Sequence, residues 1–319
     1  MLKSREEIAY QAAQMYYIQA DTMEAIARKL KVSRSTVSRL IQMARDAGYV
    51  QFTLHPPLGE PTWLRGEISQ LFGLNVHVVS VPARISAKRR LDMVAAVAGY
   101  VISEAVEVNT VIGIAWGNTL AAISENLVPR TVAGVRVVQL NGAANMATSG
   151  IRYAGGILEA FGRAYNARVQ HFPVPAFFDY ADTKTALWRE RSIRAVLDLQ
   201  KETDLAVFGV GTVEGEHLSQ VYSAGYLDPT EMVQIHQDGV VGDVCTVLLR
   251  EDGSWEDLQI NDRASGPNPA DLSAIPRRVC VVAGIDKARP LLAALRAGVA
   301  TDLVVDEDCG SRLMELARG

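Results

Sequence analysis

Residues 23–42 read MEAIARKLKVSRSTVSRLIQ, and this stretch decides the fold of the first part of the chain. Its apolar positions have the spacing of two short helices that cross at a tight turn. Ala27 is small where the helices approach closely, Val32 fills the turn, and the Ser33 hydroxyl can cap the second helix. That helix has an apolar face with helical spacing, formed by Val37, Leu40, Ile41 and Ala44. The pattern predicts a helix-turn-helix.

The other face of the second helix carries hydroxyls, an amide and guanidinium groups, and it has no acid before Asp46. Such a face can enter the major groove of DNA and bond to base edges and phosphates. An ordinary amphipathic hairpin is the alternative, although such surfaces usually mix both signs of charge. Lys31 stands at the turn, where a left-handed backbone costs about 1 kcal/mol. The expected DNA-binding residues are Ser33, Arg34, Ser35, Thr36, Ser38, Arg39 and Gln42.

Charge is unevenly distributed over the 319 residues, whose composition (49% hydrophobic, 21% charged) is typical of a soluble globular protein. Residues 1–55 hold eight Lys and Arg against five Asp and Glu, net +3, whereas the rest of the chain is net −7. A basic head on an acidic body fits a DNA-reading domain joined to a sensing domain. We therefore expect a helix-turn-helix domain at 1–55, a linker at 56–62 and an effector-binding and oligomerisation domain at 63–319.

Residues 50–54 alternate apolar and polar side chains, which predicts a short strand or wing, and the proline-rich segment after them cannot sustain a helix. Beyond it, helical and strand patterns alternate. Strands such as 205–208, 279–282 and 303–305 are continuously apolar, which indicates burial on both faces. The fold class is therefore α/β, with a doubly wound, mostly parallel, Rossmann-like sheet. One helix is predicted at 182–201, and one strand at 244–249.

Several chemistries have no support in the sequence. Cys245, Cys280 and Cys309 lack metal-ligand spacing with histidine, so no zinc site is expected. There is no phosphate loop, no dinucleotide fingerprint after the first strand and no catalytic histidine–carboxylate spacing. A signal peptide and a membrane-spanning apolar run are also missing. We expect a cytoplasmic protein that is not an enzyme, with no cofactor, no metal and no membrane partner.

The ends of the predicted strands carry the candidate ligand-binding residues, because open parallel sheets bind ligands beyond their carboxyl ends. After strand 110–115, Gly117 lets the backbone approach an anion, and Asn118 and Thr119 add donors where a helix begins. A glycine turn with an ordinary helix cap is the alternative there. Asp243 could accept from sugar hydroxyls or merely cap a turn. Lys287 is predicted in the first turn of a helix, where a bound anion would offset the dipole, or else it reaches solvent.

These motifs, in this order, resemble those of the SorC family of bacterial transcriptional regulators, sometimes grouped with the deoxyribonucleoside regulators. The resemblance covers nearly the whole chain and rests on Tyr16-Tyr17, residues 32–40, 113–120, 138–142, Gly242-Asp243, 261–263 and 283–287. It implies a winged DNA-binding domain and an effector domain similar in fold to glucosamine-6-phosphate deaminase and ribose-5-phosphate isomerase. It also implies a sugar, polyol or sugar-phosphate effector and a homo-oligomer, dimer or tetramer.

Strand ends and resemblance together predict one set of effector-binding residues: Gly113, Trp116, Gly117, Asn118, Thr119, Asn141, Asp243 and Lys287. The chain departs from the family pattern at Ile285, at residues 264–269 and at Asn118, where other members can have a hydroxyl or Arg. Because Asn118 is neutral, the effector can be either a polyol or a monophosphate.

The predicted function is that of a DNA-binding regulator of carbohydrate catabolism, whose partners are double-stranded operator DNA and a carbohydrate effector. The alternative is a sugar-phosphate isomerase or deaminase with a fused DNA-binding head, in which Asp243 would serve as the base.

Overall fold

The computed structural model describes residues 4–50, 61–146, 151–215 and 219–319. The chain divides into two compact units, residues 1–54 and 55–319. Most of the predicted strand at 50–54 and most of the predicted linker at 56–62 lie outside the described residues, which stop at Val50 and resume at Pro61. Across the described ranges, no helix is long and apolar enough to cross a membrane.

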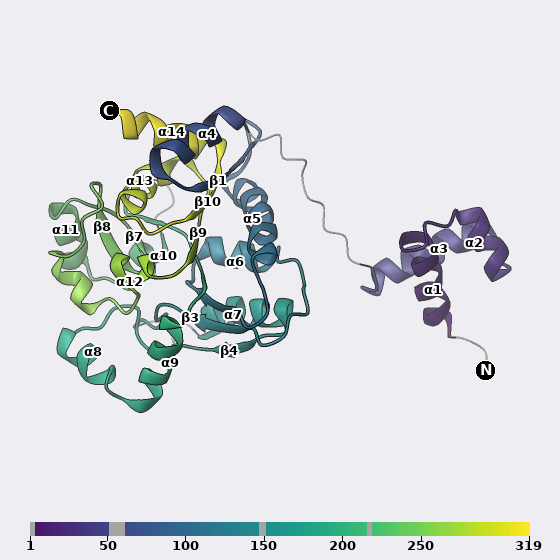
Figure 1. Ribbon diagram of the computed structural model, residues 1–319, viewed down its shortest axis with the longest axis horizontal. Helices are drawn as coiled ribbons and strands as arrows, with labels where there is room; N and C mark the ends of the chain where they lie inside the picture. Colours follow the sequence, from purple (N-terminus) through teal and green to yellow (C-terminus); the bar gives the residue numbers. More distant parts are fainter. Residues whose placement is uncertain (1–3, 51–60, 147–150, 216–218) are drawn as a thin grey trace. The chain divides into compact units, whose positions relative to one another are not determined.

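The first unit is a bundle of three helices, α1 (Arg5–Tyr17), α2 (Met23–Leu30) and α3 (Arg34–Asp46) (Figure 1). The predicted apolar face of α3 is buried, and it packs against three alanines of α1 and against Ile26 of α2. The Ser33 hydroxyl caps α3 by accepting from the Thr36 N–H at 3.1 Å. Gly48, at φ +74°, follows the end of α3 and lets the chain leave the helix in a left-handed conformation. These contacts confirm the two crossing helices.

Lys31 forms the turn between α2 and α3. Its backbone is left-handed, at φ 55° and ψ 44°. The N–H groups of Lys31 and Val32 donate to the carbonyls of Arg28 and Ala27 at 3.3 and 3.0 Å, which satisfies the last turn of α2. The turn is therefore closed by a lysine in a conformation that favours glycine.

The second unit is built on seven parallel strands in the order β1-β10-β9-β5-β2-β3-β4 (Figure 1). The strands are β1 (Asn75–Val79), β2 (Val111–Ile114), β3 (Arg136–Gln139), β4 (Arg168–Gln170), β5 (Leu205–Phe208), β9 (Arg277–Val282) and β10 (Asp302–Asp306). In β5, Leu205 and Val207 join the core on one face, whereas Ala206 and Phe208 join the core on the other. Strands of this kind have no polar face, which explains the continuous apolar runs.

Helices cover both faces of the sheet. One face packs against α5 (Ala87–Glu104), α6 (Asn118–Ser124) and α7 (Ile151–Tyr165). The other packs against α4 (Thr62–Phe72), α9 (Arg191–Lys201), α13 (Ala288–Arg296) and α14 (Glu307–Arg318). The prediction of a doubly wound, mostly parallel sheet is confirmed.

A small antiparallel sheet of β6 (Gly211–Thr212), β7 (Val240–Val244) and β8 (Val247–Arg250) lies outside the parallel one. The predicted single strand at 244–249 is wrong, because the chain turns back at Cys245 and Thr246. Their φ angles of 50° and 72° are both left-handed. Asp243 therefore lies within β7 and does not open a strand.

The predicted helix at 182–201 is two helices, α8 (Ala181–Leu187) and α9. The chain breaks between them because Trp188 packs its ring against Phe172 and Phe178. The remaining short helices are α10 (Gln220–Ser223), α11 (Pro229–Gln237), α12 (Pro269–Ser273), η1 (Gln259–Arg263) and η2 (Ile285–Lys287).

Candidate functional site

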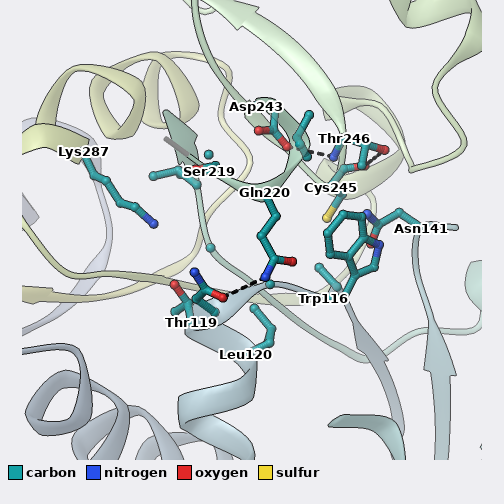
Figure 2. Close-up of a pocket in the computed structure, with 17 residues that line it drawn as sticks. Trp116, Thr119, Leu120, Asn141, Ser219, Gln220, Asp243, Cys245, Thr246 and Lys287 are labelled. Carbon is teal, nitrogen blue, oxygen red and sulfur yellow. Dashed lines mark hydrogen bonds between the residues drawn. The ribbon is translucent and has the colours of Figure 1, made fainter. Parts of the chain in front are cut away.

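A cavity lies at the carboxyl edge of the parallel sheet, where the strand order reverses between β2 and β5. The segments that follow β2, β3, β5 and β9 line it, together with the β7–β8 turn (Figure 2). In doubly wound sheets this reversal is where ligands bind. The lining includes seven of the eight predicted effector residues: Trp116, Gly117, Asn118, Thr119, Asn141, Asp243 and Lys287.

Gly113, the eighth predicted residue, does not line the cavity. It lies inside β2, where a Cβ atom would approach the Leu140 side chain to 2.7 Å and the Thr203 side chain to 2.9 Å. Glycine is required there by the packing of the sheet, and the prediction that Gly113 contacts the ligand is corrected.

The segment after β2 forms one wall of the cavity. Gly117 has φ +139°, a conformation that favours glycine, and a Cβ atom there would meet nothing within 4 Å. Trp116 is held in place, because its indole N–H donates to the Gly142 carbonyl at 2.8 Å and its ring stacks on Tyr226 at 5.2 Å. The first N–H groups of α6 have no side-chain cap among the described residues. This wall therefore presents backbone donors to the cavity.

Asn118 joins two neighbouring elements. Its Oδ1 accepts from the Tyr153 hydroxyl of α7 and from the Gln220 side-chain amide of α10, both at 3.0 Å. Gln220 reaches across the cavity, with this bond drawn as the dashed line at its amide (Figure 2). Of the Asn118 side chain, the N–H₂ group has no hydrogen-bond partner among the described residues and is left for a ligand. The sequence does not indicate Ser219 or Gln220, because a four-residue helix has too little periodicity to predict.

Asp243 caps a turn with one oxygen and faces the cavity with its carboxylate. Its Oδ2 accepts the Thr246 N–H at 3.0 Å, whereas its Oδ1 is buried with no hydrogen-bond partner among the described residues. Gly211 leaves room for it, since a Cβ atom at that position would lie 1.8 Å from Oδ1. Burial raises the pKa of Asp243 to about 6, against the lowering effects of the Thr246 N–H, the nearby Tyr222 hydroxyl and the Lys287 ammonium. The Tyr222 hydroxyl is itself buried and makes no hydrogen bond of normal geometry among the described residues, so it lies near the carboxylate without closing a bond to Oδ1. The carboxylate therefore caps a turn with one oxygen and still has the other available to accept from a sugar hydroxyl, so the two predicted roles do not exclude each other.

Asn141 presents a second buried oxygen. It follows β3, is 2% exposed, and its Oδ1 also has no hydrogen-bond partner among the described residues. A buried acceptor without a donor costs about 1–3 kcal/mol, so such atoms commonly serve a ligand. Hydroxyl groups of a ligand would supply the donor that Asn141 Oδ1 lacks, and a further donor for Asp243 Oδ1 besides the nearby Tyr222 hydroxyl.

Lys287 points its ammonium into the cavity, opposite the β7–β8 turn (Figure 2). It ends η2 and immediately precedes α13, so the prediction that it lies in the first turn of a helix is off by one position. Burial lowers its pKa, and Cys309, Asp243 and Cys280 act in the opposite direction. The side chain does not simply extend into solvent, and an anionic ligand group would compensate for its burial.

The β7–β8 turn is strained. Thr246 is β-branched and left-handed, a combination that costs about 1–3 kcal/mol and clusters at functional sites. Gly266 supports the turn from behind, because a Cβ atom there would come within 1.8 Å of the Cys245 carbonyl. Cys245 and Thr246 both line the cavity. No residue signals this turn, since hairpins of this type usually have Asn-Gly.

The predicted DNA-binding residues all lie on α3 or at its cap, and all but partly buried Thr36 are exposed. The Ser33 hydroxyl lies 2.8 Å from the hydroxyls of Ser35 and Thr36. Two of the other residues have acidic neighbours that the sequence did not indicate. Arg34 pairs with Glu24 of α2 at 3.0 Å, and Gln42 donates to Asp46 at 2.8 Å.

Ser38 and Arg39 have no hydrogen bond or ion pair within the part of the chain that the structure describes. They are therefore the side chains of α3 that can bond to another molecule without losing a contact. Within the same ranges, no group of three or more His, Cys, Asp or Glu side chains could hold a metal ion.

Known proteins share this architecture over its whole length. The chain is 30% identical to the Deoxyribonucleoside regulator of Bacillus subtilis, an alignment that covers 98% of this chain and 99% of the relative. The family model described as "Putative sugar-binding domain" matches residues 57–315. The chain belongs to the SorC family of transcriptional regulators. The predicted resemblance is confirmed.

Two solved structures extend the comparison. A domain of a possible sugar-binding transcriptional regulator from Arthrobacter aurescens TC1 is 45% identical, with a TM-score of 0.75, and covers 81% of this chain and 99% of its own. The full-length sorbitol operon regulator SorC from Klebsiella pneumoniae is 21% identical, with a TM-score of 0.79 and coverage of 98% and 99%. The second likeness concerns the fold alone. As a SorC-family member, the chain carries a sugar-binding domain of transcriptional regulators.

Proposed function

We propose that this SorC-family protein is a DNA-binding regulator of carbohydrate catabolism whose effector, a sugar, polyol or sugar phosphate, binds in the cavity at the carboxyl edge of the sheet. The observation that carries the proposal is the chemistry of the lining. Two buried acceptor oxygens, of Asn141 and Asp243, call for hydroxyl donors. A cation, Lys287, and the backbone after Gly117 call for an anionic or strongly polar group. Carbohydrates and their phosphates combine these features.

The helix-turn-helix supports the other half of the proposal. Ser38 and Arg39 lie exposed on α3 with no hydrogen bond or ion pair to any described residue, and Arg39 brings a guanidinium suited to a guanine edge or a phosphate. Relatives named as transcriptional regulators align over nearly the whole chain, including this unit. We infer that the first unit reads operator DNA and that the second unit senses the effector.

We further propose a homo-oligomer, dimer or tetramer, in which paired α3 helices read two half-sites. The effector would then change the packing of subunits, and with it the spacing of these helices. A ligand that favours one arrangement ten-fold contributes about 1.4 kcal/mol per site to such a shift.

A thermal-shift screen of pentoses, hexoses, their polyols and their phosphates tests the proposal. Bound ligand stabilises by mass action, about 2.7 kcal/mol at a concentration one hundred times its Kd. We expect a small group of related compounds to raise the melting temperature in a saturable way. A complete screen in which none of these compounds shifts the melting temperature would contradict the proposed effector class.

One observation favours a second candidate, a sugar-phosphate isomerase or deaminase. Asp243, with its pKa raised by burial to about 6, has the properties of a general base in the cavity. Incubating the full chain with pentose and hexose phosphates, and following aldose–ketose conversion and ammonia release, separates the two. Sustained turnover that is lost in Asp243→Asn would establish the enzyme; binding without turnover supports the regulator.

A further inference from the structure

The turn that carries Lys287 into the cavity is held from behind by a buried carboxylate. Asp306 ends β10 and is 0% exposed. Its Oδ2 accepts the backbone N–H of Gly284 at 2.6 Å, and its Oδ1 accepts the N–H of Cys309 at 3.2 Å. Arg90 of α5 donates to the same Oδ1 at 2.5 Å. One side chain therefore joins β10, the segment after β9, α14 and α5.

Gly284 is the point at which this carboxylate acts on the cavity. Its φ of +105° is a conformation that side chains other than glycine rarely adopt. The Lys287 N–H donates to the Gly284 carbonyl at 3.1 Å, which closes η2. The position of Gly284 therefore sets where the Lys287 side chain starts.

We propose that Asp306 is a positioning residue of the effector site, which fixes the Gly284 turn so that Lys287 points into the cavity. Arg90 supports this role by neutralising the charge of the buried carboxylate. It is itself mostly buried and also pairs with Asp308 at 2.7 Å. Asp306 does not line the cavity, so its effect passes through the backbone of the turn. The inference rests on the proposed function of the cavity.

The chemistry of the two Asp306 oxygens makes the role testable. Both oxygens act only as acceptors, one towards Gly284 and one towards Arg90 and Cys309. An Asn side chain keeps the shape but offers one acceptor and one donor. Asp306→Asn must therefore place an N–H₂ group against a donor on one side, and either the Gly284 turn or the Arg90 pair loses its acceptor.

Asp302 provides a matched control on the same strand. It begins β10, its side chain is 3% exposed, and it pairs with Arg277 at 3.1 Å. Asp302→Asn thus removes the same charge from an equally buried, arginine-paired position at the amino end of β10. That end of a parallel strand lies away from the carboxyl edge and the cavity.

The experiment compares the full-length wild type, Asp306→Asn and Asp302→Asn by two readouts that need no effector. Hydrogen exchange measures the amides of residues 284–287, and competitive acetylation with acetic anhydride measures the reactivity of the Lys287 amine. We expect Asp306→Asn to speed exchange of these amides at least ten-fold over Asp302→Asn, after scaling to equal global stability. We also expect it to change Lys287 acetylation several-fold. Equal behaviour of the two variants in both readouts would overturn the proposal.

Two Arg90 variants keep the proposal falsifiable if Asp306→Asn does not fold. Arg90→Lys keeps the cation and should retain near wild-type exchange and acetylation, whereas Arg90→Met should move both readouts in the direction expected for Asp306→Asn. Identical values for Arg90→Met and the wild type would contradict the role of Arg90. A failed effector screen would overturn the proposed function and leave these readouts intact, so the two failures are distinguishable.

Discussion

Burial of a single carboxyl group, that of Asp243, makes the stability of the fold depend on pH. Its carboxylate is buried at 6% exposure, and burial raises its pKa to about 6, above the ordinary value of 3.8. The folded state therefore holds a proton that the unfolded state has released at intermediate pH. The stability that this protonated carboxyl group contributes is fully present below about pH 4 and is lost as the pH rises through about 6.

This linkage predicts that Asp243→Asn, which cannot ionise, stabilises the protein at pH 8 by up to about 3 kcal/mol and has a much smaller effect at pH 4.5. The Asn oxygen can still accept the Thr246 N–H. Urea denaturation of both proteins at the two pH values measures the difference. A gap between the proteins that does not grow with pH would show that Asp243 ionises normally.

The loss of ligand affinity that we expect on replacing Lys287 depends on whether the effector is phosphorylated. Lys287→Ala should weaken a phosphorylated ligand by about 1–3 kcal/mol, the range of a charged hydrogen bond, and should weaken an unphosphorylated polyol less. Calorimetric titration with the compounds found in the screen measures both. Lys201→Ala, which removes an exposed lysine paired with Asp198, is the control. Equal loss in the two variants would argue against contact between Lys287 and the ligand.

Among the helices and strands, α3 is the one that we expect to contact operator DNA. Arg39→Ala removes an exposed guanidinium that has no partner among the described residues, so folding should be unaffected while affinity for operator DNA falls by about 1–3 kcal/mol. Fluorescence anisotropy with DNA selected from a random library measures the affinity. Lys29→Ala, on α2, removes the same charge where it pairs with Asp21 and is the control. An unchanged affinity of Arg39→Ala would place the recognition surface elsewhere.

The turn between α2 and α3 makes a separate stability prediction. Lys31 holds a left-handed backbone at φ 55°, so Lys31→Gly should stabilise the first unit by about 1 kcal/mol. Hydrogen exchange of the α2 and α3 amides in the full chain measures the change. Faster exchange in the variant would mean that the lysine side chain contributes more than its backbone costs.

Elements with a strong periodic pattern could be predicted from the sequence, and elements defined by tertiary contacts could not. The apolar spacing of α3 and the continuous runs of β5 and β9 predict the observed elements because burial on one or both faces leaves a direct mark on the residues. The β7–β8 turn leaves no such mark, because Cys245 and Thr246 are not turn-forming residues. The break after α8 arises from the packing of Trp188, which no local pattern encodes.

The residues that line the cavity also divide into those that the sequence pattern predicts and those whose positions depend on tertiary contacts. Six of its lining residues could be predicted because the parallel topology brings the carboxyl ends of strands to one edge. Asp243 lies on the antiparallel strand β7, and the Gly242-Asp243 pair of the family resemblance is what indicated it. Gly113 does not line the cavity, because this glycine serves the packing of the sheet against Leu140 and Thr203. Gln220 and Cys245 could not be found, since they reach the cavity through α10 and the antiparallel hairpin, whose positions depend on the fold of the whole second unit.

At the scale of the whole molecule, the proposed function combines an effector-sensing unit and a DNA-binding unit in one chain. The basic first unit carries Arg39, and the acidic second unit carries the cavity. Regulation requires that the effector bind the arrangements of the oligomer with different affinity, because a ligand with equal affinity for both shifts nothing. Binding of an effector and binding of DNA must then influence each other by the same factor.

Regulation of DNA binding by the effector is tested by operator affinity, measured with and without the effector. The measurement is an anisotropy titration of selected DNA with the wild type and with Lys287→Ala, each at zero and at saturating concentration of the sugar compound found in the thermal screen. We expect a change of ten-fold or more in the Kd of the wild type, and a much smaller change in the variant at the same effector concentration. An operator affinity that no sugar, polyol or sugar phosphate alters would contradict the proposed regulation.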